Sequence, residues 1–180
     1  MTNPFVAPDL TAPPVSHIVD SPIGRLLLTS DGHALTELTM IDAAKHAGRY
    51  EAGFTPSPEA FGEVAAQLEA YFGGDLKEFT VPLAPSGSPF QLAVWTELTK
   101  IPYGSTVSYG DIARALGKRL VASRAVGLAN GANPIAVIVL CHRVIGSDGS
   151  LTGYGGGLPL KRKLLEHEAR VCGTRLDLFG

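Results

Sequence analysis

Short apolar runs separated by turn sequences near the start of the chain predict strands, and the segment that follows has a helical period. From His17 to Met40, the apolar runs RLLLT and ALTEL are separated by the turn sequences SPIG and SDGH, which predicts a small antiparallel meander. Residues 41–57 show neither period and are expected to be irregular. Between Pro58 and Phe72, apolar residues recur every three or four positions, which predicts an amphipathic helix ended by Gly73-Gly74. EFTVPL at 78–83 then predicts a short strand.

The second half of the chain shows mostly helical spacing. A helix is expected from Phe90 to Leu98 and a turn at PYGS. Ser108 followed three residues later by Asp111 is a capping-box pattern, which begins a helix ending at Gly117. A further helix over about Val121–Gly131 would make the pair a helix-turn-helix.

The remainder of this half combines a buried segment with a loop and a last helix. PIAVIVL, at 134–140, is a continuous apolar run that predicts a buried strand. The glycine-rich loop GYGGG at 153–157 precedes a helix expected from about Pro159 to Glu168.

These elements suggest two domains in a chain of 180 residues. APSGSP, at 84–89, is the expected boundary. Residues 1–15 are rich in proline and are expected to be a disordered or loosely docked extension. An N-terminal α/β domain is then expected at 16–85, and a C-terminal domain at 86–180.

Composition and charge narrow the class of protein. There is no apolar run of the roughly 18 residues that a membrane span needs and no signal-peptide pattern, so we expect a cytoplasmic protein without a membrane partner. Residues 1–86 hold 4 Lys/Arg and 11 Asp/Glu, whereas residues 87–180 hold 11 Lys/Arg and 6 Asp/Glu. A basic second half is typical of a protein that contacts a polyanion there, although a solvated surface gives the same counts.

The candidate chemistry centres on Cys141, one of two cysteines, which ends the buried apolar run and directly precedes His142. A thiol is a useful nucleophile only as the thiolate, so it needs a base, and His142 is the obvious one. Since successive strand side chains point to opposite faces, the two can cooperate only if the chain turns there or a water bridges them. Glu168 is a candidate to orient the imidazole. The alternative is a buried cysteine that acts as a small hydrophobic residue.

The helix expected at Val121–Gly131 carries unusually small side chains: Ala122, Ser123, Ala125, Gly127, Ala129 and Gly131. Such a helix could press against the narrow minor groove of DNA, where sequence readout is poor. Close packing between helices explains the same residues. Arg124 is the one long charged side chain of this helix, and it could lie over a phosphate or enter the base stack.

Three stretches resemble a known family: IPYGSTVSYGDIARALG, then SRAVGLANGANPIAVIV followed after one residue by CHRVIG, then LTGYGGGLPLKRKLLEHE. They closely resemble the O6-alkylguanine-DNA alkyltransferases, also called methylated-DNA–protein-cysteine methyltransferases. The strong match covers residues 88–169, and a weaker one covers about 17–83.

The resemblance implies an α/β protein with an RNase H-like N-terminal domain and a winged-helix C-terminal catalytic domain that contains the helix-turn-helix. The implied function is DNA repair by single-use transfer of the alkyl group from O6-alkylguanine, and from O4-alkylthymine, to Cys141. The implied partner is double-stranded DNA, bound in the minor groove with the damaged base flipped out, by a protein expected to be a monomer.

The resemblance also assigns individual roles. Cys141 matches the alkyl acceptor, and His142 and Glu168 match the water-bridged relay that makes the thiolate. Asn133 matches the residue that joins the recognition helix to the active-site strand, and Tyr109 matches the tyrosine that strains the target phosphate and donates to the guanine ring. The implied DNA and base contacts come from the arginine finger Arg124, the Val144 carbonyl, and the closing-loop residues Tyr154 and Gly155.

This sequence departs from the family pattern in three places. Leu140 stands where proline usually precedes the cysteine, the turn GKRLVAS lacks the usual proline and is one residue longer, and Gly155 replaces a serine of some relatives. The N-terminal half has no cysteine, so no zinc is expected there. No cofactor is expected either.

Three other functions remain as alternatives. Because of the Leu140 departure, the protein could bind alkylated DNA with weak or no transfer. It could also be a winged-helix regulator that senses alkylation at Cys141, or a cysteine hydrolase.

Overall fold

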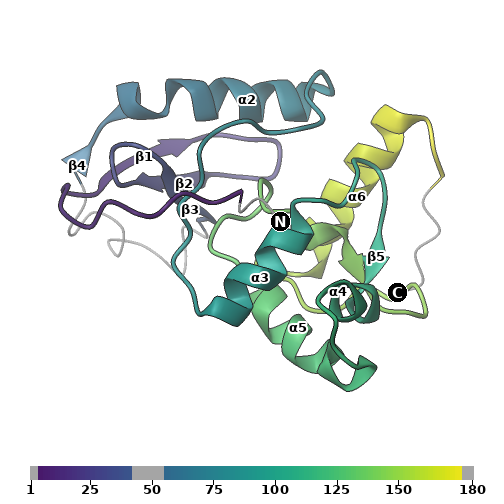
Figure 1. The fold of residues 1–180 in the computed structure, drawn as a ribbon. Coiled ribbons are helices and arrows are strands. Elements are labelled where there is room, and N and C mark those ends of the chain that lie inside the picture. The colour runs from purple at the N-terminus through teal and green to yellow at the C-terminus, as the bar shows by residue number, and fades with distance from the viewer. Residues whose placement is uncertain (1–3, 42–54, 176–180) are drawn as a thin grey trace. The chain divides into compact units, whose positions relative to one another are not determined.

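The computed structural model describes residues 4–41 and 55–175. The chain divides into two compact units, Met1–Ser86 and Gly87–Gly180. Each combines helices with strands, and the main sheet is mixed, so the expected α/β class is confirmed (Figure 1).

The N-terminal unit contains a four-stranded sheet in the order β3-β2-β1-β4. β1 (Val15–Val19), β2 (Leu26–Ser30) and β3 (Leu35–Met40) are successive antiparallel neighbours, which confirms the predicted meander. β2 lies between β1 and β3 and is buried along its whole length. Most of the stretch expected to be irregular, residues 42–54, lies outside the described residues. Its end, Thr55–Pro56, forms β4, which pairs in parallel with β1.

One helical segment runs along a face of this sheet (Figure 1). A 3-10 turn, η1 (Pro58–Phe61), leads into α2 (Gly62–Gly73), which confirms the predicted amphipathic helix. The buried side chains of α2, Val64, Leu68 and Tyr71, follow the helical period. Gly74 ends the helix in the left-handed conformation at φ 90°, which favours glycine because it has no Cβ.

The segment expected to be disordered or loosely docked, residues 1–15, is mostly exposed where it is described, but it contacts the rest of the unit at Phe5, which is 7% exposed and forms a bridge with Leu83. Asp9 also contacts the rest of the unit, since its N–H donates to Asp31 Oδ2 at 2.8 Å. The segment 78–83 is not a strand, because Leu83 alone pairs there, through isolated bridges to Phe5 and Leu35. One buried aromatic residue therefore anchors a segment whose proline content suggests disorder.

The C-terminal unit begins with three helices that pack on one another. α3 (Pro89–Leu98) and α4 (Tyr109–Ala115) each start at a capping box, Ser88 with Gln91 and Ser108 with Asp111. A 3-10 turn, η2 (Leu120–Ala122), precedes α5 (Ser123–Gly131). Trp95 of α3 is buried, and its Nε1 donates to the Ala129 carbonyl of α5 at 2.8 Å. The predicted helices are confirmed, and α4 and α5, which follow one another along the chain, pack against each other.

Residues 134–140 do not form the predicted strand. They make a series of tight turns, in which Val139 N–H donates to the Ile135 carbonyl and Val137 has a positive φ of 71°. A continuous apolar run indicates burial but does not distinguish a strand from a buried turn. The chain then forms the 3-10 helix η3 (Cys141–Arg143) and the short strand β6 (Val144–Ile145).

Two further elements complete this unit. β6 pairs in parallel with β5 (Val107–Ser108). The last helix, α6 (Leu158–Cys172), begins near its predicted start and extends four residues past Glu168. Its buried face packs against η3.

Candidate active site

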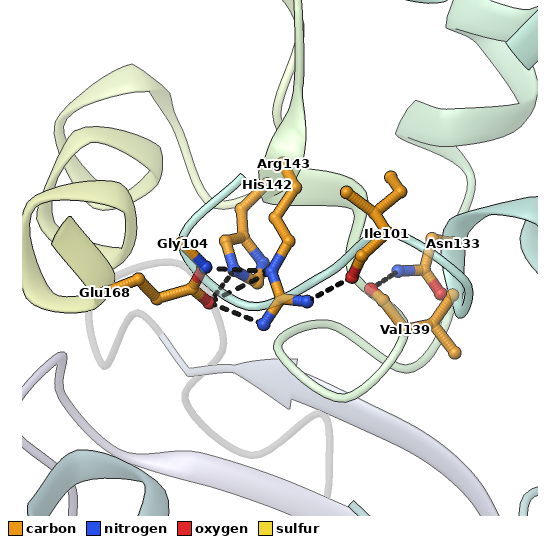
Figure 2. Close-up of polar contacts among 7 residues, drawn as sticks. All are labelled: Ile101, Gly104, Asn133, Val139, His142, Arg143 and Glu168. Atoms are coloured by element: carbon orange, nitrogen blue, oxygen red, sulfur yellow. Dashed lines mark hydrogen bonds and ion pairs between the residues drawn. The ribbon is translucent and has the colours of Figure 1, made fainter. Parts of the chain in front are cut away.

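The Cys141 thiol lies at the start of η3 and accepts a hydrogen bond from an asparagine that follows α5. Cys141 is 4% exposed. Asn133 Nδ2 donates to Cys141 Sγ at 3.0 Å and to the Val139 carbonyl at 2.8 Å, the second of which is drawn in Figure 2. Asn133 Oδ1 accepts the Ile135 N–H at 3.0 Å. The side chain of Asn133 therefore satisfies the backbone of the tight turn and contacts the sulfur.

His142 and Glu168 meet in the interior, and Arg143 joins them (Figure 2). His142 Nε2 lies 2.7 Å from Glu168 Oε1, and both side chains are fully buried. Arg143 Nε and Nη2 donate to the same carboxylate at 2.9 and 3.0 Å, and the Gly104 N–H donates to it at 3.1 Å. Arg143 Nη1 donates to the Ile101 carbonyl at 2.5 Å. η3 turns the chain between Cys141 and His142, as cooperation between the two side chains requires.

The charge state of this cluster follows from its contacts. Burial alone would raise the pKa of Glu168, but the hydrogen bonds and charges of His142 and Arg143 outweigh burial and lower it to about 2. Burial lowers the pKa of His142, against the opposing effect of Glu168. An ionised carboxylate can only accept hydrogen bonds, so Nε2 carries the imidazole proton. Nδ1, which has no hydrogen-bond partner among the described residues, is then the basic nitrogen.

The thiol itself is protonated at neutral pH. Burial raises the pKa of Cys141 to about 11, although the Asn133 hydrogen bond and the positive charge of Lys161 oppose the rise. A thiolate therefore forms only when a base takes the proton at the moment of reaction.

Lys161 and Tyr109 hold the loop that precedes α6. Lys161 is fully buried, and its Nζ donates to the Thr152 carbonyl at 2.7 Å. The Tyr109 hydroxyl donates to the same carbonyl at 2.8 Å. Burial lowers the pKa of Lys161 to about 8, although the Cys141 thiolate would favour its charge. Tyr109 at the start of α4 and Lys161 on the buried face of α6 thus hold the loop at the same atom, the Thr152 carbonyl oxygen.

α5 presents different residues on its two faces. Val126, Ala129 and Asn130 are buried, whereas Arg124 and Ala125 are exposed. Ser123 Oγ donates to the Leu120 carbonyl at 2.6 Å, which fixes the start of the helix. Within the described residues, no hydrogen bond or ion pair links Ser123, Arg124 or Ala125 to Cys141.

The remaining predicted site residues lie near Tyr109, the loop and β6. A Cβ at Gly127 would be 3.7 Å from the Tyr109 ring, and one at Gly155 would be 3.8 Å from the Gly131 carbonyl. Tyr154 has a buried hydroxyl, and Val144 is fully buried in β6. The structure thus joins Cys141 to Asn133 and His142 to Glu168 by hydrogen bonds.

Three buried polar residues of this site were missed by the sequence analysis: Arg143, Lys161 and Asn130. A signal for Lys161 was present, because it shares a helical face with the buried residues Leu164, Leu165 and Glu168. Arg143 and Asn130 had no comparable signal, since a charged or amide side chain is usually exposed.

The described residues contain neither a candidate metal site nor a candidate membrane-spanning helix. In 4–41 and 55–175, no cluster of three or more His, Cys, Asp or Glu side chains is placed to hold a metal ion. No helix within these ranges is both long and apolar enough to cross a membrane.

Comparison with known proteins gives matches over both units. Residues 89–170 match the family model of the 6-O-methylguanine DNA methyltransferase DNA binding domain, and residues 15–85 match that of its ribonuclease-like domain. The chain is 52% identical over 161 residues to the methylated-DNA–protein-cysteine methyltransferase of Mycobacterium tuberculosis, which covers 89% of this chain and 96% of the relative. The protein of that name from Methanosarcina acetivorans is 50% identical over 151 residues, or 84% and 96% of the two chains.

Solved structures agree with these matches. The crystal structure of the M. tuberculosis O6-methylguanine methyltransferase superposes with a TM-score of 0.80 at 51% identity, over 87% of this chain and 93% of that one. The M. tuberculosis protein in complex with DNA gives a TM-score of 0.79 at the same identity and coverage.

Proposed function

Because the chain belongs to the 6-O-methylguanine DNA methyltransferase family, and so binds DNA and repairs it by moving an alkyl group onto its own cysteine, we propose that Cys141 is the acceptor. The observation that carries this assignment is the buried cluster in which Asn133 holds the sulfur and Glu168 orients the neighbouring imidazole. Cys172, the other cysteine, is exposed, and no such pair of contacts surrounds it in the described structure.

The transfer proceeds through the thiolate. His142 Nδ1 accepts the thiol proton through a bridging water, and the Glu168 carboxylate stabilises the imidazolium that results. The Cys141 sulfur then attacks the alkyl carbon, the bond from that carbon to guanine O6 breaks, and its electron pair stays on the guanine. Tyr109 donates a proton to the guanine ring, and the proton held by His142 replaces it through solvent, so that the guanine leaves neutral. The product is a thioether, which has no easy leaving group, so each molecule reacts once.

The target base reaches Cys141 by leaving the DNA stack. A sulfur that is almost fully buried cannot reach a base within the duplex, so extrusion of the base is required. We assign the solvent-accessible side of α5 to the minor groove of double-stranded DNA, with exposed Ala125 and half-buried Ser123 and Gly127 allowing close approach. Arg124 fills the gap that the extruded base leaves behind.

The loop and β6 would bind the extruded guanine. The Val144 carbonyl accepts from the guanine amino group, and the Gly155 N–H donates to O6. Tyr154 closes over the base. Two observations support this assignment: Lys161 and Tyr109 both anchor the loop at Thr152, and the Tyr154 hydroxyl is buried where a Cys141 thiolate would raise its pKa.

Two further features belong to the same proposal. The protein acts as a monomer, since each chain contains a full set of the proposed residues. It acts in the cytoplasm, where reducing conditions keep a free thiol such as Cys141 from oxidising.

The test is an intact-mass measurement after mixing the protein with a duplex that contains one O6-methylguanine. We expect a gain of one methylene per molecule, mapped by peptide analysis to Cys141, and no gain in Cys141→Ala. Cys172→Ala is the matched control and should gain the same mass as the wild type. Catalytic turnover, or a modification that maps to Cys172, would refute the assignment.

Leu140 supports a second candidate, binding of alkylated DNA with little transfer. Leucine, unlike proline, does not fix the backbone angle before the nucleophile. The Leu140 φ is −76°, however, which lies within the range that proline imposes. The same mass measurement separates the two candidates, since a binding module would retain DNA affinity and gain no mass.

A further inference from the structure

Asn130 is a buried polar residue of α5 to which the chemistry above assigns no role. Its side chain is 2% exposed, and its Nδ2 donates to the Cys141 carbonyl oxygen at 3.3 Å. Its Oδ1 has no hydrogen-bond partner among the described residues. A buried acceptor without a partner costs stability, so an apolar side chain of the same size would suit the core better. Stability alone therefore does not explain an amide here.

The oxygen that Asn130 contacts closes the turn that carries the nucleophile. The Cys141 carbonyl also accepts the Val144 N–H, so two donors converge on it. Since this carbonyl already has a backbone partner, losing Asn130 would not leave it unsatisfied. The additional donor instead restricts rotation of the peptide that follows Cys141. The orientation of that peptide sets the direction in which the Cys141 thiol points. It also sets the direction of the backbone that leads on to Val144.

Asn130 and Asn133 act on the same residue at two different atoms. Asn130 lies in the last turn of α5 and Asn133 two residues beyond its end, and Asn133 contacts the sulfur while Asn130 contacts the carbonyl. The hydrogen bond from Trp95 to the Ala129 carbonyl fixes this end of the helix from the other side. The buried face of α5 therefore locates Cys141, while its opposite face is exposed.

We propose that Asn130 is a positioning residue for the alkyl transfer, which holds the Cys141 peptide so that the sulfur points at the alkyl carbon. This inference rests on the proposed function of Cys141. It predicts an effect on the rate of transfer from bound DNA and none on the binding of DNA, because Asn130 lies on the buried face of α5.

The test is Asn130→Leu, which keeps the number and branching of the side-chain heavy atoms and removes both the donor and the unpartnered acceptor. In a single-turnover assay with a saturating O6-methylguanine duplex, we expect the transfer rate to fall about three- to tenfold, as loss of one hydrogen bond allows. The dissociation constant for the duplex should change less than twofold. The melting temperature should stay the same or rise.

Val126→Ala is the matched control, since Val126 is fully buried on the same face of α5. It should lower the melting temperature and leave the saturating rate of the folded protein unchanged. A wild-type rate in Asn130→Leu would overturn the inference, and so would a rate that falls only together with the melting temperature. If the wild-type protein gains no methyl group on Cys141, the proposed function fails instead.

Discussion

Replacing Arg143 with methionine removes the guanidinium that holds Glu168 in the interior. Arg143 is 2% exposed and makes three hydrogen bonds of 2.9–3.2 Å to a carboxylate that is fully buried. Removing one partner of a buried ion pair leaves the other charge uncompensated, which costs about 3–5 kcal/mol. The variant should therefore lose about that much of the free energy of unfolding of the C-terminal unit.

Urea denaturation followed by tryptophan fluorescence measures this loss directly. Trp95 is the single tryptophan of the chain and lies in the same unit, so its signal reports on that unit. Arg114→Met is the matched control, because Arg114 pairs with Asp111 at the surface, where an ion pair contributes about 0–1 kcal/mol.

A double-mutant cycle tests whether the loss in Arg143→Met comes from the ion pair between Arg143 and Glu168. Glu168→Gln removes the charge that Arg143 compensates, so the double variant should lose less than the sum of the two single losses, by about 1–3 kcal/mol. Additive losses, or a loss in Arg143→Met no larger than in the surface control, would show that the ion pair does not hold this part of the fold.

Three further outcomes follow from the site. Arg124→Ala should slow repair of duplex DNA far more than reaction with the free base, which needs no extrusion, and equal losses in the two assays would contradict the role of Arg124. Leu140→Pro should raise the transfer rate, because proline fixes the backbone angle before the nucleophile, and should change DNA affinity little, because the φ of Leu140 already suits proline. An unchanged or lower rate would show that the fold already holds this backbone. Glu168 has its pKa lowered from 4.5 to about 2, so the unfolded state binds its proton first as the pH falls. The stability that this carboxylate contributes, about 3 kcal/mol, should be lost from about pH 4.5 toward pH 2 in an acid titration, and Glu168→Gln should lack this loss.

The sequence predicted elements best where the signal is local. Ser108 and Asp111 lie three residues apart and form the expected capping box, and Gly74 ends α2 in the left-handed conformation. The predicted family and the α/β class are also confirmed, because the motifs around CHRVIG are long enough to be specific.

Predictions failed where side-chain hydrogen bonds or contacts between distant residues decide the conformation. The run PIAVIVL has the composition of a strand, but the Asn133 side chain bonds its backbone and favours tight turns instead. Phe5 is buried through its pairing with Leu83, which no local pattern reveals. Arg143 and Glu168 are 25 residues apart, and only the packing of α6 on η3 brings them together.

The positive φ of Val137 has a consequence for the motions of this unit. A β-branched residue in the left-handed region carries strain of about 1–3 kcal/mol, which persists only because the surroundings enforce it. Local opening of residues 134–140 releases that strain, so opening costs less free energy than it would for a relaxed turn with the same burial. We expect amides of this segment to exchange with deuterium before those of α3. Transient opening of this segment therefore provides a route to Cys141 for thiol reagents that are too large to enter the closed site.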